Sequence, residues 1–349
     1  MTKFSVEVAV PIVDSFRVQQ VAGMFDVPPA EQARRRFEVE LPVDEESWRV
    51  GLIVGPSGSG KSTIARHAFG HHVHQPSAWP EQRAIVDGFG DLSIRHIAGL
   101  LTAVGLSSPP TWLKPFHVLS TGEQFRCNLA RALATASKTL VVDEFTSVVD
   151  RTVAQIGSAA IAKAVRSQLV AARFVAVTCH YDVEPWLEPD WTLDMAAQTL
   201  HRRRLRRPTI SLELYRCEHR AWRLFAPHHY LSGKLNRGAQ CYVAVWGEAP
   251  VAFAAVLPMF GSQRWRLSRL VTLPDYQGVG IGMRVAESLG DYYLAQGRRF
   301  SVTAAHPSML RHCSRSPRWR MTRLIRHGRR SSNGRAMASF ELLPDTAAS

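Results

Sequence analysis

The stretch Gly55-Pro-Ser-Gly-Ser-Gly-Lys-Ser-Thr63 decides the fold of the first half of the chain. It follows the apolar run Trp48–Val54, which predicts a buried strand, and it opens Lys61–Ala68, which predicts a helix. A glycine-rich turn in this setting presents backbone N–H groups to phosphate oxygens, and the lysine and the hydroxyl after it serve phosphate and Mg²⁺. We therefore expect a nucleotide site made by Gly55, Ser57, Gly58, Gly60, Lys61, Ser62 and Thr63, with Ser62 as a Mg²⁺ ligand.

Two further apolar runs, Leu140–Val142 and Phe174–Thr178, are typical of strands buried in a parallel sheet. The first run ends in Asp143 and Glu144. We expect Asp143 to bind Mg²⁺ and Glu144 to orient and deprotonate the attacking water. Helical spacing of apolar residues predicts helices over Ser93–Val104 and Gly122–Thr135.

The hexad Leu119-Ser-Thr-Gly-Glu-Gln124 lies between the phosphate loop and the Asp143-Glu144 pair. This order resembles the ATP-binding-cassette (ABC) ATPase family over about residues 48–190, with Ser147–Asp150 similar to its D-loop and His180 at its switch position. The resemblance implies an α/β P-loop fold and a homodimer that sandwiches ATP and Mg²⁺ head to tail. It also implies catalytic roles for Glu144 and His180, and contacts to ATP from Ser120, Gly122, Gln124 and Asp150.

The chain departs from the ABC pattern in two places. Thr121 replaces a small glycine of the signature, and only 59 positions separate Lys61 from Ser120, which indicates a shortened helical lobe. After the strand-like Ala84–Asp87, Asp87 occupies the place expected for the Q-loop glutamine. Asp87 is therefore a further candidate Mg²⁺ ligand, and Gln75 is the alternative Q-loop residue.

A second glycine-rich turn, Gln277-Gly-Val-Gly-Ile-Gly282, joins the predicted strand Arg264–Leu273 to the predicted helix Met283–Ala295. Its successive N–H groups and the helix N-terminus form a cradle for an anion. Together with the preceding Pro274-Asp-Tyr276, this stretch resembles the acyl-coenzyme A motif of the GNAT N-acetyltransferase family. The resemblance implies that acetyl-CoA, or another acyl-CoA, is held by Leu273, Gln277, Gly278, Val279, Gly280, Ile281 and Gly282.

The rest of the second half fits a smaller α+β GNAT-like domain with a mixed, largely antiparallel sheet. We expect further strands over Ser211–Cys217, Cys241–Trp246, Val251–Leu257 and Arg299–Ala304. The expected organisation is an ABC-type domain over 1–200 with an N-terminal β-layer over 1–47, an Arg-rich linker over 201–210, a GNAT-like domain over 211–327 and a flexible tail over 328–349.

The acyl-transfer residues are less defined than the cradle. Many GNAT enzymes keep a tyrosine after the strand that corresponds to Arg299–Ala304, and none follows it here. His306, Ser308 and His312 are the substitutes in that segment, and the cluster His228-His-Tyr230 is another candidate. A partly buried polar cluster explains the latter equally well.

Charge separates the two halves of the chain. Residues 1–200 carry 18 of the 43 lysines and arginines and 21 of the 29 acidic residues. Residues 201–349 carry the remaining 25 lysines and arginines but only 8 acidic residues. All 25 cations except Lys234 are arginines, which pair with phosphates and stack on bases. We therefore expect nucleic acid as a partner of this half; a basic surface that only aids solubility is the alternative.

Other features narrow the class of protein. The five cysteines form no C-x-x-C pair, which argues against a zinc site and a disulfide framework. No uninterrupted apolar run has the length of a membrane span, and we expect a cytoplasmic location. The sequence thus predicts an ABC-type ATPase coupled to an acyl-CoA-dependent N-acyltransferase that acts on or binds nucleic acid. The alternatives are an ATP-dependent nucleic-acid-binding protein with a non-catalytic GNAT-like domain, and the ATP-binding subunit of a transporter.

Overall fold

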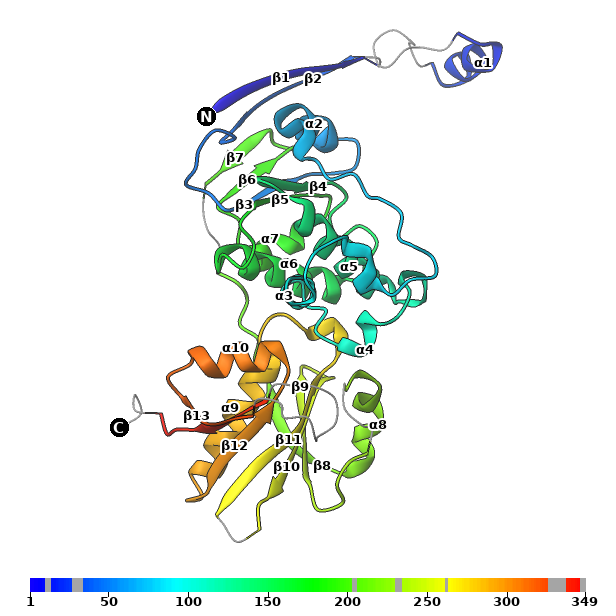
Figure 1. Ribbon diagram of the computed structural model, residues 1–349. Helices are drawn as coiled ribbons and strands as arrows, with labels where there is room; N and C mark the ends of the chain where they lie inside the picture. Colours follow the sequence, from blue (N-terminus) through cyan, green and yellow to red (C-terminus); the bar gives the residue numbers. More distant parts are fainter. Residues whose placement is uncertain are drawn as a thin grey trace. The chain divides into compact units, whose positions relative to one another are not determined.

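A computed structural model describes residues 1–9, 14–26, 34–202, 206–229, 234–260, 263–325 and 337–345, which form two compact units (Figure 1). The first unit comprises residues 1–76, 136–147 and 171–206, and the second comprises 77–135, 148–170 and 207–349. This division differs from the boundary expected at 201–210. Residues 77–135 and 148–170, here called the helical segments, belong to the same unit as the expected GNAT-like domain.

The sheet of the first unit carries the expected nucleotide motifs. Its strand order is β4-β5-β3-β6-β7, with β3 parallel to β5 and β6, β4 parallel to β5, and β7 antiparallel to β6. The strands are β3 (Val50–Val54), β4 (Thr139–Val142), β5 (Arg173–Thr178), β6 (Trp191–Asp194) and β7 (Thr199–His201). All five residues of β3 are buried, as its continuous apolar sequence predicts. The parallel strands expected from the sequence are confirmed.

Helices and an outer ribbon surround this sheet. Helix α2 (Lys61–Phe69) contributes Ile64 to a core that includes Ile53 and Trp191. Strands β1 (Thr2–Ala9) and β2 (Arg34–Leu41) form an antiparallel ribbon whose alternate residues Phe37, Val39 and Leu41 are buried in the same core, as expected for the N-terminal β-layer. The remaining helical elements are α1 (Phe16–Phe25), η1 (Gly70–His72), η4 (Tyr181–Val183) and α7 (Glu184–Leu187).

The second unit contains a seven-stranded sheet in the order β13-β14-β12-β11-β10-β9-β8. Among the described strands of this sheet, β11 and β12 pair in parallel and the other pairs are antiparallel, so the expected mixed sheet is confirmed. The strands are β8 (Glu213–Cys217), β9 (Gln240–Trp246), β10 (Ala249–Pro258), β11 (Arg264–Thr272), β12 (Arg299–Ala304), β13 (Trp319–Ile325) and β14 (Met337–Leu342). Helix α9 (Ile281–Leu294) buries Val285, Leu289 and Tyr293 in the core of this sheet.

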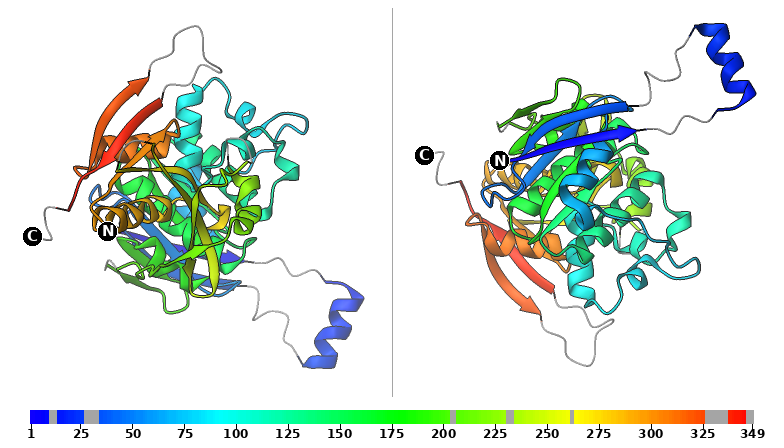
Figure 2. Two further views of the ribbon diagram at one scale, coloured as in Figure 1. Left: turned by 90° about the horizontal axis from the view of Figure 1, so that it is seen from below. Right: turned by 90° about the horizontal axis from the view of Figure 1, so that it is seen from above.

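The expectation of a flexible tail over 328–349 is wrong for part of that range. Strand β14 pairs with β12 on one side and with β13 on the other, and Figure 2 shows β13 in orange beside β14 in red. Ala338, Phe340 and Leu342 alternate into the core, with exposed fractions of 1%, 0% and 2%. The short apolar alternation was obscured by its arginine- and serine-rich surroundings. Residues 328–336 and 346–349 lie outside the described residues.

The helical segments, together with helical elements between the strands of the seven-stranded sheet, make up the rest of the second unit. Helix α5 (Thr121–Thr135) begins with a capping box, since the Glu123 amide donates to Oγ of Ser120 and the Ser120 amide donates to Oε2 of Glu123 at 3.3 and 3.0 Å. The other elements are η2 (Ile85–Phe89), α3 (Ile94–Ala103), α4 (Pro109–Trp112), η3 (Phe116–Val118), α6 (Arg151–Arg166), η5 (His219–Ala221), α8 (Trp222–Phe225), η6 (Ala226–His228), η7 (Pro274–Tyr276) and α10 (Pro307–Arg315). The strand-like reading of Ala84–Asp87 is wrong, because η2 begins at Ile85 and Ala84 forms only an isolated bridge with Pro115. In the described part of the chain, no helix combines the length and the apolar character that crossing a membrane requires.

Candidate functional site

The nucleotide motifs of the first unit meet at one edge of its sheet. The phosphate loop follows β3, Asp143 and Glu144 follow β4, and His180 follows β5 by two residues. These three strands are parallel and pair in register, with Val54 opposite Thr178 and Val142 opposite Ala176. The carboxyl ends of parallel strands therefore bring the three motifs together, which is where open α/β sheets bind ligands.

The phosphate loop can admit only glycine at its last turn. Gly60 has a φ of +86°, and a Cβ built on it would lie 2.5 Å from the Phe37 ring. Because Gly60 is also the N-cap of α2, the first-turn N–H groups of that helix point out without helical acceptors. Nζ of Lys61 donates to the carbonyl of Pro56 at 2.7 Å, which folds the lysine back over the loop. The loop is a cradle for phosphate oxygens.

A hydroxyl and a carboxylate are paired beside this cradle. Oγ of Ser62 donates to Oδ1 of Asp143 at 3.0 Å, and the backbone N–H of Glu144 donates to the same oxygen at 3.0 Å. Arg66 lies 3.8 Å from the other oxygen. Two hard oxygen donors next to a phosphate cradle fit Mg²⁺, which takes one or two protein ligands along with the phosphates of its nucleotide. The described residues contain no group of three or more His, Cys, Asp or Glu side chains arranged for a metal.

Glu144 and His180 flank the pair. Glu144 is exposed, has a φ of +53°, and accepts a 2.7 Å hydrogen bond from Oγ of Ser147, which holds its carboxylate at the strand end. Non-glycine residues in this backbone region are uncommon and cluster at functional sites. The amide of His180 donates to Oγ1 of Thr178 at 3.2 Å, while its ring is half-buried.

The signature residues lie in the second unit, as do residues 148–150 of the D-loop-like segment, whereas Ser147 lies in the first unit. Ser120 caps α5, Asp150 caps α6 by accepting from the Val153 amide at 3.0 Å, and Nε2 of Gln124 donates to the carbonyls of Phe116 and Leu119. A Cβ on Gly122 would lie 3.2 Å from Val153. Asp87 is an exposed residue of η2 in the same unit, whereas Gln75 is an exposed residue of the first unit.

The second candidate site is a cavity of about 870 Å³ that opens where β11 and β12 separate. These strands pair only from Arg264–Leu267 to Arg299–Val302, although β11 continues to Thr272 and β12 to Ala304. Beyond that point β11 retains its pairing with β10 alone, so its other edge faces the cavity. An unpaired strand edge is a row of donors and acceptors for an extended amide-containing ligand.

The glycine turn closes one end of the cavity. Gly278 and Gly280 have φ values of +97° and +102°, and Gly280 is the N-cap of α9. A Cβ on Gly278 would lie 2.7 Å from Cβ of Ala160 and 2.9 Å from Cα of Gly105, both in the helical segments. The α9 N-terminus, with Ile281 and Gly282 in its first turn, is left open for an anion. These features fit the diphosphate of an acyl-CoA.

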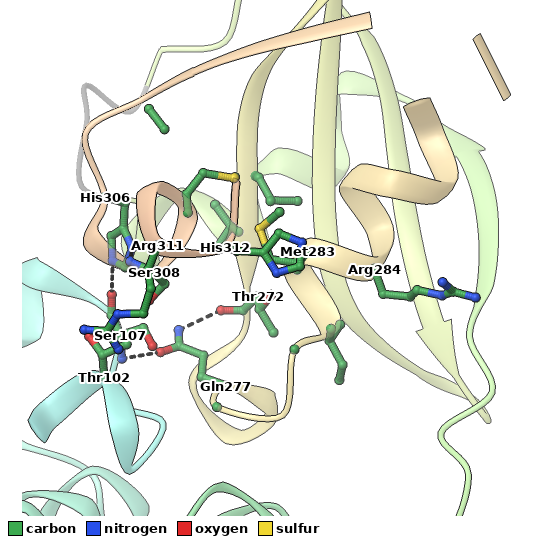
Figure 3. A pocket seen from close by; sticks show the side chains of 18 of the residues that line it. Thr102, Ser107, Thr272, Gln277, Met283, Arg284, His306, Ser308, Arg311 and His312 are labelled. Atoms are coloured by element: carbon green, nitrogen blue, oxygen red, sulfur yellow. Dashed lines mark hydrogen bonds between the residues drawn. The ribbon is translucent and has the colours of Figure 1, made fainter. Parts of the chain in front are cut away.

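Two residues expected to hold the coenzyme are engaged within the chain. Figure 3 shows Gln277 bridging its neighbours: Oε1 accepts from the Ser107 amide at 2.7 Å and Nε2 donates to the Thr272 carbonyl at 2.8 Å. Leu273 donates its N–H to Val251 and accepts from the amide of Tyr276. These residues shape the turn. Gly280, Ile281 and Gly282 line the cavity, whereas the Val279 side chain packs against the core of the sheet.

The candidate residues for acyl-transfer chemistry differ in the hydrogen bonds that their side chains already form. Nε2 of His306 donates to the Ser107 carbonyl at 2.8 Å while Nδ1 accepts from the Ser308 amide, so both nitrogens are engaged, and burial lowers the pKa of His306. His312 lines the cavity (Figure 3), and its Nε2 is 2.7 Å from Oε1 of Glu287. Burial also lowers the pKa of His228, a cavity residue; Tyr230 lies outside the described residues. The His312–Glu287 pair is the arrangement suited to accepting a proton.

Sequence reasoning missed three residues around this cavity. Arg126 of α5 is 1% exposed and donates to the carbonyls of Gly105 at 2.6 Å and Asp275 at 2.9 Å. Lys163 of α6 lines the cavity, and Glu287 anchors His312. Only the helical position of Arg126, between Phe125 and Cys127, hinted at burial. The other two stand at surface-like positions of amphipathic helices.

Comparisons with known proteins agree with the two sets of motifs. Residues 205–309 match the family model described as the Acetyltransferase (GNAT) family. A zinc import ATP-binding protein (ZnuC 1) of Hahella chejuensis is 29% identical over 165 residues, which is 41% of this chain. The chain spans about three fifths (61%) of that relative's length.

Solved structures resemble either the N-terminal or the C-terminal part of the chain. A dimeric bacterial ABC transporter cassette has a TM-score of 0.36 and 16% identity, covering 48% of this chain and 89% of its own. A Bacillus subtilis acetyltransferase in complex with CoA has a TM-score of 0.31 and 12% identity, covering 38% and 98%. The chain thus carries a GNAT-family domain at residues 205–309 and homology to ABC ATPases in its N-terminal part.

Proposed function

We propose that this protein is an ABC-type ATPase coupled to an acyl-CoA-dependent N-acyltransferase. The observation that carries the second activity is the cavity between β11 and β12, which joins an unpaired strand edge to a glycine turn at the N-terminus of α9. An extended pantetheine amide suits the edge and a diphosphate suits the turn. Acetyl-CoA, or another acyl-CoA, supplies the acyl group. The amine nitrogen forms an amide bond to the acyl carbon while the thioester C–S bond breaks, and coenzyme A leaves as the thiol.

For the ATPase half, we propose hydrolysis of ATP with Mg²⁺ at the phosphate loop. Ser62 and Asp143, 3.0 Å apart, provide the oxygens for Mg²⁺, and Glu144 orients and deprotonates water. His180 stands at the end of β5 to contact the terminal phosphate. Ser120, Gly122, Gln124 and Asp150 would complete the site across a head-to-tail homodimer, as the ABC resemblance implies.

For the acyltransferase half, we propose His312 as the base that takes the proton of the acceptor amine. Its Nε2–H donates to Glu287, which leaves Nδ1 as the lone-pair nitrogen and stabilises the ring when it becomes charged. His306 keeps both ring nitrogens in backbone hydrogen bonds and is a positioning residue at the start of α10. The N–H groups of the turn bind and orient the coenzyme.

The proposed acceptor is an amine of nucleic acid. Arginine supplies 24 of the 25 cations of residues 201–349, and Arg315, Arg320 and Arg323 are exposed in the described part of the chain. Such a surface binds phosphates in a salt-dependent way. Two alternatives remain in view: a nucleic-acid-binding ATPase whose GNAT-like domain is not catalytic, and a transporter subunit, with which the likeness to a zinc import ATP-binding protein is also consistent.

One experiment separates these possibilities. The protein is incubated with labelled acetyl-CoA and ATP-Mg²⁺ and, separately, with DNA, RNA or cell protein, and the labelled polymer is identified. We expect label on nucleic acid, and loss of that label in His312→Ala with acetyl-CoA binding retained. Label on protein alone would overturn the nucleic-acid acceptor. Acetyl-CoA binding and ATP hydrolysis without transfer would support the binding protein, and copurification with a membrane protein would support the transporter subunit.

A further inference from the structure

A lysine of the helical segments stands at the glycine turn of the acyl-CoA cavity. Lys163 lies on α6, and its Nζ would be 3.6 Å from a Cβ built on Gly280, the N-cap of α9. Lys163 also lines the cavity. A cation and the open end of a long helix therefore face the same space from two different parts of the chain.

The charge of Lys163 is not neutralised within the described structure. No described carboxylate forms an ion pair or a hydrogen bond with it, and Arg207 is the charged neighbour that affects it. Partial burial, and then the charge of Arg207, lower the pKa of Lys163. A lysine ammonium and a helix N-terminus that face the same space both stabilise an anion placed between them.

The rest of the cavity wall has the same sign. Its ionised side chains other than histidine comprise one acid, Glu287, which is held by His312, and five cations. The cations are Lys163, Arg269, Arg284, Arg311 and Arg315. Of these, Lys163 is the one placed beside Gly280, where the N–H groups of the turn converge.

We propose that Lys163 binds the diphosphate of acyl-CoA, so that a helix of the ABC-like part completes the coenzyme site of the GNAT-family domain. The inference rests on the proposed acyl-CoA function. An anion held by the N–H groups of the turn lies about 3 Å from their nitrogens, which places it within reach of a lysine ammonium next to Gly280. The pantetheine and acyl parts of the ligand extend toward β11 and do not contact this lysine.

The test measures dissociation constants by calorimetry for the full chain and for Lys163→Met, which keeps the length of the side chain. Three ligands separate the phosphates: acetyl-CoA, acetyl-dephospho-CoA, which lacks only the 3′-phosphate, and S-acetylpantetheine, which has no phosphate. We expect Lys163→Met to weaken the first two about tenfold and S-acetylpantetheine not at all. Lys163→Arg should keep most of the affinity.

A matched control is Lys114→Met, since Lys114 is an exposed lysine of the helical segments that does not line the cavity. It should leave all three affinities unchanged. Equal binding of acetyl-CoA by Lys163→Met and the wild type, or an equal loss for S-acetylpantetheine, would overturn the role of Lys163. A loss confined to acetyl-CoA would assign the lysine to the 3′-phosphate instead and would also overturn the proposal. If the wild type binds no acetyl-CoA, the proposed function itself fails.

Discussion

The substitution Arg126→Met tests how the acyl-CoA turn is held in place. Arg126 is 1% exposed and donates to the carbonyls of Gly105 and Asp275 at 2.6 and 2.9 Å. Burial lowers the pKa of Arg126 to about 10, while the nearby charges of Asp275 and Glu123 favour the charged form. The guanidinium therefore remains protonated at neutral pH and joins the ABC signature helix to the turn that precedes Gln277.

Two opposing effects set the magnitude. Methionine removes the cost of burying a charge, which alone would stabilise the protein. It also leaves two carbonyls without their charge-assisted partner, at about 1–3 kcal/mol each. Because the hydrogen bond to the Gly105 carbonyl is buried and the one to the Asp275 carbonyl is partly buried, we expect the second effect to win and the free energy of unfolding to fall by about 2–4 kcal/mol. The loosened turn should also weaken acetyl-CoA binding about tenfold.

The assay combines urea unfolding with calorimetric titration of acetyl-CoA. Arg131→Met is the control, since Arg131 lies on the same helix and donates to the Ala78 and Ser77 carbonyls, away from the turn. It should reduce stability without changing acetyl-CoA affinity, and Arg126→Lys should restore part of both quantities. An Arg126→Met variant that is as stable as the wild type and binds acetyl-CoA equally would refute this reasoning.

Three further predictions follow from single contacts. Gly278→Ala should cost about 3 kcal/mol in unfolding free energy and weaken acetyl-CoA binding, because Gly278 has a φ of +97° and its new Cβ would lie 2.9 Å from Cα of Gly105. The control Gly247→Ala should cost about 1 kcal/mol, because Gly247 has a φ of +61° but no atom within 4 Å of the new Cβ. Glu144→Gln should slow ATP hydrolysis at least about a hundredfold in a phosphate-release assay, with ATP binding retained. Glu341→Gln should lower the free energy of unfolding by about 1 kcal/mol at pH 7, since the hydrogen bond from Arg299 lowers the pKa of Glu341 in the folded protein. The difference in unfolding free energy between variant and wild type should vanish as the pH falls from about 4.5 through that lowered pKa. A difference that does not change with pH would contradict the assignment.

Much of the fold could be predicted because its signals are local. A continuous apolar run such as Val50–Val54 marks a buried parallel strand, and a glycine turn before Lys61 marks the loop that follows it. The hairpin of β9 and β10 was visible for the same reason. The strand Met337–Leu342 was missed because its strand character depends on pairing with two other strands. Of these, β12 is distant in the sequence and β13 was not recognised.

The candidate sites show the same contrast between local sequence signals and long-range contacts. Motif residues such as Ser62 and Asp143 are brought together because each follows a strand of one parallel sheet, so their meeting could be expected from order alone. The contacts of Gln277 could not. Its amide spans Ser107 and Thr272, and the first of these lies 170 positions earlier in the chain. No local pattern records which segment a side-chain amide will meet.

Contacts of the glycine turn also show how the GNAT-family domain is connected to the helical segments. A flexible connection would leave the GNAT-family turn complete in itself and its surface polar. Here Gly278 approaches Gly105 so closely that neither position accepts a side chain, and a buried arginine of the signature helix bonds the backbone of the turn. A residue as costly to bury as Arg126 is stable there only while both carbonyls stay in place. The limits of the family match at 205–309 are therefore not the limits of the packed unit, because the acyl-CoA turn is built on the helical segments that also carry the ABC signature.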